Sequence, residues 1–309
     1  MPPHFSLLVL LLFFLLLVVL YSFQYSSSQN APVLRSRNAP ATEFLSFFSS
    51  SSSNSTVSTH LRCLTRRPHL AGTPSSSSAA AYVLSRLRSA GLQTLTRTYS
   101  PLLSYPSSSS LSLLRPDHSL LKPLSLLEPA DPSPSSGVVP PYHAYSPSGS
   151  AVAPPVFVNF GRDEDYVVLD KLGVEVSGKV VIVRRGMGPR GAVVAKAAEK
   201  GAEAVVMFGD RTDGGVERGT VMSGSVGDPL TPGWAAVGAR GAERLREEDE
   251  EVRRRLPRIP SMPVSAETAT EILRALGGPA APEEWCFGAA AEVRGVGGGN
   301  VLLNFTYRR

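Results

Sequence analysis

The sequence predicts an α/β fold with a parallel sheet at its centre, and three observations support this prediction. Short apolar runs rich in β-branched residues, at 156–160, 178–183 and 204–208, are typical of buried strands. Two segments with helical spacing of apolar residues, 163–172 and 192–200, separate these runs, and a glycine follows each segment. The resulting order of strand, helix, strand, helix, strand favours parallel pairing, because the connecting helices cover the sheet.

Further elements are expected on both sides of this unit. Residues 75–92 carry apolar side chains at helical spacing, with the serines at 75–78 available as caps. Apolar and polar residues then alternate over 92–99, which predicts a strand. Near the other end, 266–276 is expected to be a helix that stops at a Gly-Gly-Pro sequence, and 301–307 is strand-like.

The N-terminal segment is of the membrane type. Residues 5–20 are apolar except for Ser6, and extension to Phe23 brings a helix close to the ~30 Å of a bilayer core. We therefore expect a transmembrane helix at 5–23 after a short cytoplasmic tail at 1–4. A cleaved signal peptide is the alternative, but a basic n-region and an A-x-A site are both lacking. The preferred interpretation is a single-pass type II protein of the endoplasmic reticulum, another secretory membrane or the cell surface, with a lumenal C-terminal domain.

A serine-rich stretch, 24–59, is expected to be a flexible stalk, because it cannot bury enough apolar surface to offset its ordering entropy. Asn54 and Asn304 begin N-x-S/T sequons and are candidate glycosylation sites. Cys63 and Cys286 lack any metal-binding or redox spacing. They either pair in an oxidising lumen or remain two unpaired small side chains.

The positive charge of the chain does not indicate a nucleic-acid partner. The net charge is +5 and the isoelectric point is near 9.4, but the basic residues are scattered. The densest basic run directly follows an acidic run within 247–255, which is typical of a solvated helix face. We therefore expect no nucleic-acid binding.

Four stretches together carry a resemblance to a known family. HLRCLTRRPHLAGTP begins at residue 60, and VFVNFGRDEDYVVLDKLGVEVSGKVVIVRRG begins at 156. ERGTVMSGSVGDPLTPGW covers 217–234, and RIPSMPVSAETATEILRALGGPAAPEEW covers 258–285. From about residue 60 onward, the chain resembles the plant membrane-bound glutamate carboxypeptidases. These are M28 zinc metallopeptidases, with N-acetylated α-linked acidic dipeptidase and the transferrin receptor as relatives.

The resemblance implies a domain organisation. Residues 60–105 would be the first, incomplete piece of an M28 peptidase domain. Residues 106–309 would form a protease-associated (PA) domain with a mixed β-sheet and flanking helices. Family members are often homodimers, so a homodimer is an expected partner, together with the membrane and a peptide or protein ligand.

Full-length members of this family remove C-terminal glutamate or other acidic residues from peptides. They use two zinc ions held by His, Asp and Glu ligands, with a glutamate as general base. The last histidine of this chain is His143, and Glu247-Glu248 and Glu283-Glu284 fit solvated positions better than a metal site. Ser223 and its neighbours do not form a nucleophile elbow. We predict no catalytic residue, no zinc ligand and no cofactor for this chain alone, whereas the full-length family carries zinc and calcium.

Binding residues also follow from the resemblance. Arg190 matches a family arginine that contacts the substrate carboxylate, a task that suits a guanidinium because of its paired donors. Thr220 matches a position where some members carry a substrate-contacting asparagine. Thr231 and Trp234 match part of a structural calcium site, although calcium takes six to eight oxygens. The alternatives are a surface arginine at the start of a helix and a loop constrained by prolines.

Three hypotheses of function stay open. The first is a truncated, non-catalytic member of the glutamate carboxypeptidase family that provides a PA domain. The second is a membrane-anchored interaction or sorting module built on a PA domain. The third is a full peptidase whose remaining half is encoded downstream of Arg309.

Overall fold

The computed structural model describes residues 35–128, 139–210, 215–224, 227–237 and 244–309. The predicted transmembrane helix at 5–23 lies outside these ranges. Within them, no helix is both long enough and apolar enough to cross a membrane. The chain divides into two compact units, 1–66 and 67–309.

In the first unit, two helices lie in and just after the segment predicted to be a flexible stalk. These are α2 (Arg35–Ser51) and α3 (Asn54–Thr65). Hydroxyl groups donate to carbonyls one turn earlier, from Ser52 Oγ to Phe48 O at 2.7 Å and from Thr59 Oγ1 to Ser55 O at 2.7 Å. No residue of α3 is buried. Helices therefore occupy part of the predicted stalk, because local hydrogen bonds support them although they bury little, and the flexible stalk stays a prediction.

The second unit begins with α4 (Pro74–Ser89), as predicted, but its cap lies earlier than expected. Thr73 is the N-cap, and its Oγ1 accepts from Ser76 N at 3.3 Å, with Pro74 in the first turn. The strand predicted at 92–99 is wrong, because this segment has no regular structure and pairs with no described strand. The alternating apolar residues of this segment do not form a buried face, since Leu95 is 76% exposed.

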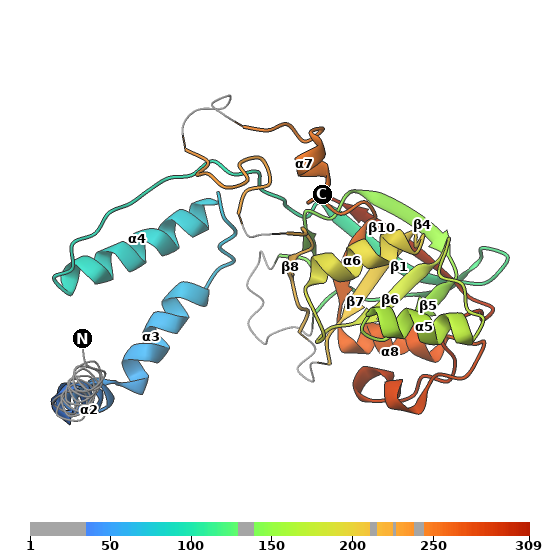
Figure 1. The fold of residues 1–309 in the computed structure, drawn as a ribbon, viewed down its shortest axis with the longest axis horizontal. Coiled ribbons are helices and arrows are strands. Elements are labelled where there is room, and N and C mark those ends of the chain that lie inside the picture. Colours follow the sequence, from blue (N-terminus) through green and yellow to red (C-terminus); the bar gives the residue numbers. More distant parts are fainter. Residues whose placement is uncertain (1–34, 129–138, 211–214, 225–226, 238–243) are drawn as a thin grey trace, which may run out of the picture. The chain divides into compact units, whose positions relative to one another are not determined.

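A four-stranded parallel sheet forms the centre of this unit, which confirms the α/β prediction (Figure 1). Its strands, in spatial order, are β5 (Pro155–Phe157), β6 (Val180–Arg184), β7 (Ala204–Phe208) and β9 (Ser261–Val264). Between successive strands run α5 (Asp163–Lys171) and α6 (Arg190–Glu199). All residues of β6 and β7 are buried, as expected for strands covered on both faces.

A second sheet is antiparallel, and its four strands come from the chain segments before and after the parallel sheet. Its spatial order is β2 (Leu120–Pro123), β1 (Ser108–Leu114), β10 (Leu302–Arg308) and β4 (Gly149–Ala153). The resemblance implied one mixed sheet, whereas the named strands form one parallel and one antiparallel sheet, and β5 of the parallel sheet adds an isolated antiparallel bridge between Val156 and Gly297. The late strand β10 inserts between β1 and β4, and its alternate residues Leu303, Phe305 and Tyr307 enter the core.

Short elements complete the unit. A parallel ribbon consists of β3 (His143–Ala144) and β8 (Gly219–Thr220). The remaining helices are α7 (Glu250–Arg253), α8 (Ala266–Arg274) and the 3-10 turns η1 (Glu283–Trp285) and η2 (Gly288–Ala290). One core joins both four-stranded sheets, with α8 packed into it through Ile272 and Leu273. Each such side chain contributes about 1.5–3 kcal/mol through burial.

Candidate functional site

The candidate site lies at the carboxyl edge of the parallel sheet, where ligands of α/β proteins usually bind. Strand β6 ends at Arg184, Arg185 follows it, and α6 begins at Arg190. Gly186 and Gly188 have φ values of 136° and 139°, which favour glycine and permit the sharp turn between strand and helix. Arg185 Nη1 donates to Gly188 O at 2.8 Å and holds this turn.

Two guanidinium groups share one carboxylate at this edge. Arg190 Nη2 donates to Glu217 Oε2 at 3.3 Å, and Arg185 Nε lies 3.5 Å from the same oxygen. The Arg190 guanidinium also lies against Gly219, where a Cβ atom would be 2.7 Å from Nη1. With one carboxylate and two guanidiniums, this group of side chains carries a net charge of +1 and suits an anionic ligand.

Burial shapes the electrostatics of the site. Partial burial lowers the pKa of Arg190, and the neighbouring Arg185 lowers it further, whereas Glu217 opposes both effects. The Nε atoms of Arg185 and Arg190 are buried and have no hydrogen-bond partner among the described residues. Buried donors of this kind are normally satisfied, so the site has hydrogen-bonding capacity that the described residues leave unused.

A buried histidine that the sequence did not single out belongs to the same site. His143 pairs in register with Gly219 in the β3–β8 ribbon, so both residues face the same side of it. Its Nδ1 lies 2.9 Å from Ser261 Oγ, and its Nε2 has no hydrogen-bond partner in the described part of the chain. Burial first, then Arg190 and Arg185, lowers its pKa to about 3, so His143 is neutral at physiological pH.

The structure brings the two predicted substrate-binding positions together. Thr220 follows Gly219 in β8, and Gly219 supports the Arg190 guanidinium. Thr220 is exposed, and its Oγ1 accepts from Met222 N at 3.1 Å. The hydroxyl therefore participates in a local turn. Because successive side chains of a strand point to opposite faces, it lies on the other face of β8 from the one that Gly219 presents to Arg190.

The predicted calcium residues lie in a loop whose carboxylate already has partners. Asp228 Oδ2 accepts from Thr231 Oγ1 at 2.9 Å and from Arg244 Nη2 at 3.2 Å. Asp228 Oδ1 accepts from Leu102 N at 2.9 Å, and Trp234 N donates to Thr231 O at 3.3 Å. By themselves these residues do not fit calcium, because a guanidinium occupies the carboxylate and the threonine hydroxyl acts as a donor.

Zinc has no fitting donor set in the residues that the structure describes. They contain no group of three or more His, Cys, Asp and Glu side chains able to hold a metal ion. His143, the one histidine of the site, contacts a serine hydroxyl rather than a carboxylate.

The two candidate glycosylation sites lie in different environments. Asn54 is exposed at the first residue of α3, whereas Asn304 is half-buried in β10, between Ser112 of β1 and Val152 of β4. Sequons that carry glycans usually lie in surface loops, so Asn54 has the more suitable environment, and both sites stay predictions. Cys63 and Cys286 are free thiols in this structure.

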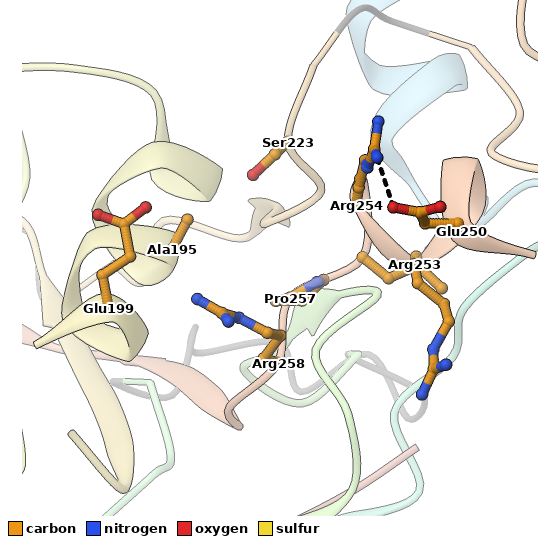
Figure 2. Close-up of a pocket in the computed structure, with 9 residues that line it drawn as sticks. Ala195, Glu199, Ser223, Glu250, Arg253, Arg254, Pro257 and Arg258 are labelled. Atoms are coloured by element: carbon orange, nitrogen blue, oxygen red, sulfur yellow. Dashed lines mark hydrogen bonds and ion pairs between the residues drawn. The ribbon is translucent and has the colours of Figure 1, made fainter. Parts of the chain in front are cut away.

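A second concave region is a weaker candidate for a functional site. It is a pocket of about 410 Å³ (Figure 2), lined by Ala195, Glu199, Ser223, Glu250, Arg253, Arg254, Leu256, Pro257 and Arg258. Arg254 and Glu250 form an ion pair, and both side chains are largely exposed. Figure 2 shows Arg258 pointing across the pocket toward α6. The pocket therefore fits the solvated, mixed-charge face predicted for 247–255, because its charges are paired or open to solvent.

Comparisons with known proteins agree with this architecture. Residues 138–272 match the PA domain family. The chain is 60% identical over 269 residues to probable glutamate carboxypeptidase VP8 of Zea mays, covering 87% of this chain and 37% of that protein. It is 43% identical over 294 residues to probable glutamate carboxypeptidase AMP1 of Arabidopsis thaliana, covering 93% and 41% respectively.

The chain thus spans about two fifths of the length of these curated relatives. Among solved structures, an aminopeptidase from Aneurinibacillus sp. strain AM-1 aligns with a TM-score of 0.40 and 16% identity. That alignment covers 81% of this chain and 42% of the aminopeptidase.

Proposed function

Because this chain belongs to the glutamate carboxypeptidase family and carries its PA domain, we propose that residues 67–309 form a carboxylate-binding module. Its ligand is a peptide that ends in glutamate or another acidic residue, as the names of the relatives suggest. The module binds this end of the peptide and does not itself cleave the bond. In this proposal, zinc chemistry is a task of other residues of the full-length family members.

The observation that carries this proposal is the Arg190 guanidinium at the carboxyl edge of the sheet. It lies over Gly219 and already contacts a carboxylate oxygen, that of Glu217, at 3.3 Å. A guanidinium has five donors in a planar fork, which matches the two oxygens of a carboxylate. Thr220 follows Gly219 in the chain and is exposed. In this proposal Arg190 orients the terminal carboxylate of an acidic peptide.

A binding assay tests this role directly. The full chain in detergent is titrated with a fluorescent peptide ending in glutamate, and with the same peptide ending in an amide. Replacement of Arg190 by Met should weaken binding by about tenfold or more, because a charge-assisted hydrogen bond contributes roughly 1.5–3 kcal/mol. Arg274→Met removes an exposed arginine paired with Glu292 and should leave affinity unchanged. Equal affinity of Arg190→Met and the unmodified protein would refute the proposal.

A hydrolysis assay tests the non-catalytic part of the proposal. The same peptide is incubated with the chain after treatment with EDTA, and again after addition of zinc. We expect intact peptide in both samples. Turnover that EDTA removes and zinc restores would instead favour a complete peptidase.

A second function, protein interaction or sorting, is favoured by the apolar surface near the start of this unit. Val83 and Leu87 of α4, together with Leu95 and Tyr99 after it, are exposed large hydrophobic residues. Exposed apolar side chains that form a contiguous patch mark sites of contact with another protein segment. Pull-down with the full chain, compared with a Leu95→Asp and Tyr99→Asp variant, tests this role. A partner retained equally by both proteins would argue against this surface.

The location and assembly of the protein are part of the proposal. We place it as a type II membrane protein of the secretory pathway with a lumenal PA module, with Asn54 as the more suitable glycan site, and as a homodimer. Protease protection in microsomes, a mobility shift on deglycosylation and light scattering test these three points. Digestion of the PA module in intact microsomes would contradict the lumenal placement.

A further inference from the structure

Glu217 contacts the guanidinium pair in a way that resembles a bound ligand. Its Oε2 lies 3.3 Å from Arg190 Nη2 and 3.5 Å from Arg185 Nε. Its other oxygen, Oε1, lies instead against Gly209, where a Cβ atom would be 2.8 Å away. One oxygen therefore serves two cations, at distances longer than the 2.7–2.9 Å typical of charge-assisted hydrogen bonds.

This contact leaves both arginines incompletely satisfied. The Nε atoms of Arg185 and Arg190 are buried without a hydrogen-bond partner in the described part of the chain. A carboxylate that met Arg190 with both oxygens would make the parallel, two-bond contact that guanidiniums favour. Glu217 does not make that contact, so a ligand carboxylate can interact better with Arg190 than Glu217 does.

The neighbours of Glu217 on both sides are held by contacts of their own, whereas the side chain of Glu217 is held by the two arginines alone among the hydrogen bonds and ion pairs of the described residues. Glu128 Oε1 accepts from Val216 N at 2.8 Å and from Arg218 Nη1 at 3.1 Å. Arg218 Nη2 also donates to Val139 O at 2.6 Å. The Glu217 side chain is 34% exposed, so rotation about its own bonds is enough to move its carboxylate from the arginines into solvent.

The charge of the site depends on this one side chain. Arg185 and Arg190 carry two positive charges, Glu217 carries one negative charge, and His143 is neutral. With Glu217 in place the site attracts a single carboxylate weakly, and without its charge the site would hold two uncompensated guanidiniums. Electrostatic attraction for an anion rises accordingly.

We propose that Glu217 is an intramolecular competitor that covers Arg190 with its own carboxylate and that an acidic peptide must displace. This inference rests on the proposed role of Arg190 in carboxylate binding. Glu217 thereby determines the affinity of the site and favours ligands whose carboxylate can contact Arg190 through both oxygens. A purely structural role, in which Glu217 orients Arg190 for the ligand, predicts the opposite sign for its replacement.

The test compares Glu217→Gln, Glu217→Ala and Arg190→Met in the full chain, titrated with the peptide ending in glutamate. Loss of the competing charge should tighten binding by about tenfold in both Glu217 variants and steepen its dependence on salt. Glu292→Gln removes a carboxylate from an exposed pair with Arg274 and serves as the matched control. The melting temperature of every variant is measured alongside to show that it folds.

The outcomes separate the two proposals. Weaker or unchanged binding in folded Glu217 variants, together with loss of binding in Arg190→Met, would overturn the competitor and leave carboxylate binding standing. Unchanged binding in Arg190→Met would overturn carboxylate binding itself. Tighter binding by Glu217→Gln in an Arg190→Met background would also overturn the competitor, since the effect would then not act through Arg190.

Discussion

Replacement of Gly219 by Ala is a steric test of how the β3–β8 ribbon positions Arg190. An added Cβ atom would lie 2.7 Å from Arg190 Nη1, 2.9 Å from Cζ and 3.3 Å from Nε. Ordinary contact begins at 3.4 Å, so the guanidinium must move by about 0.7 Å. The backbone at Gly219 lies outside the left-handed region, so alanine itself introduces no backbone strain.

The expected effect is a loss of binding rather than of stability. Displacement of the guanidinium should remove the equivalent of one charge-assisted hydrogen bond to the ligand, about 1.5–3 kcal/mol, which corresponds to roughly 10- to 100-fold weaker binding. The Arg190 side chain is 22% exposed and can move toward solvent. The free energy of unfolding should therefore change by less than about 1 kcal/mol.

The assay is titration with the peptide ending in glutamate, together with urea unfolding of the same protein. Gly149→Ala is a matched control, because its Cβ atom would meet Pro260 Cγ at 2.8 Å instead of Arg190. Wild-type affinity for Gly219→Ala, alongside weakened Arg190→Met, would show that close contact with Gly219 does not position the guanidinium. A large loss of stability in Gly219→Ala would refute the claim that the arginine can move outward.

Three further predictions concern stability. The pKa of His143 is lowered from 6.5 to about 3, so below pH 6.5 the unfolded chain takes up a proton that the folded chain does not. The free energy of unfolding should then fall by about 2 kcal/mol between pH 7 and pH 5, and His143→Gln should reduce this fall in urea titrations at the two pH values. Arg184→Met should destabilise the chain by about 2–3 kcal/mol in urea unfolding, because the buried guanidinium donates to Phe287 O at 2.8 Å and stacks on the Phe287 ring. An unchanged unfolding midpoint would contradict this role. Gly278→Ala should lower the melting temperature by several degrees, since φ at Gly278 is 78° and the Cβ atom of an alanine there would clash with Gly297 O. A wild-type melting curve would show that this close packing is not required.

The local sequence pattern was sufficient to predict most of the parallel sheet and the helices that connect its strands. The strands and helices between 155 and 208 occur where apolar runs and following glycines predicted them, and α8 begins and ends close to the expected residues. These elements bury their apolar residues within one core, so periodicity and burial agree. The prediction of a strand at 92–99 was wrong because an alternating pattern forms a strand only when a partner strand is available.

The antiparallel sheet was less predictable. Strand β1 has the sequence SSSLSLL, whose serines conceal its strand character, and its partner β10 lies nearly two hundred residues later in the chain. Tyr307 of β10 donates a hydrogen bond to His143 O at 2.8 Å and so links this sheet to the candidate site. Such pairings depend on long-range register, which a local pattern does not encode.

The sequence by itself determined the α/β class and the family, and it singled out Arg190 as a candidate binding residue, because short-range periodicity and matching motifs are properties of neighbouring residues. Only the tertiary structure decided what Arg190 meets: Gly219 beneath it, Glu217 on its donors and a neutral His143 on the same side of the ribbon as Gly219. The physical reason is that charge and hydrogen-bond energies depend on distances in space. Those distances exist only after the sheets have brought segments around 143, 185–190 and 217–219 to one edge.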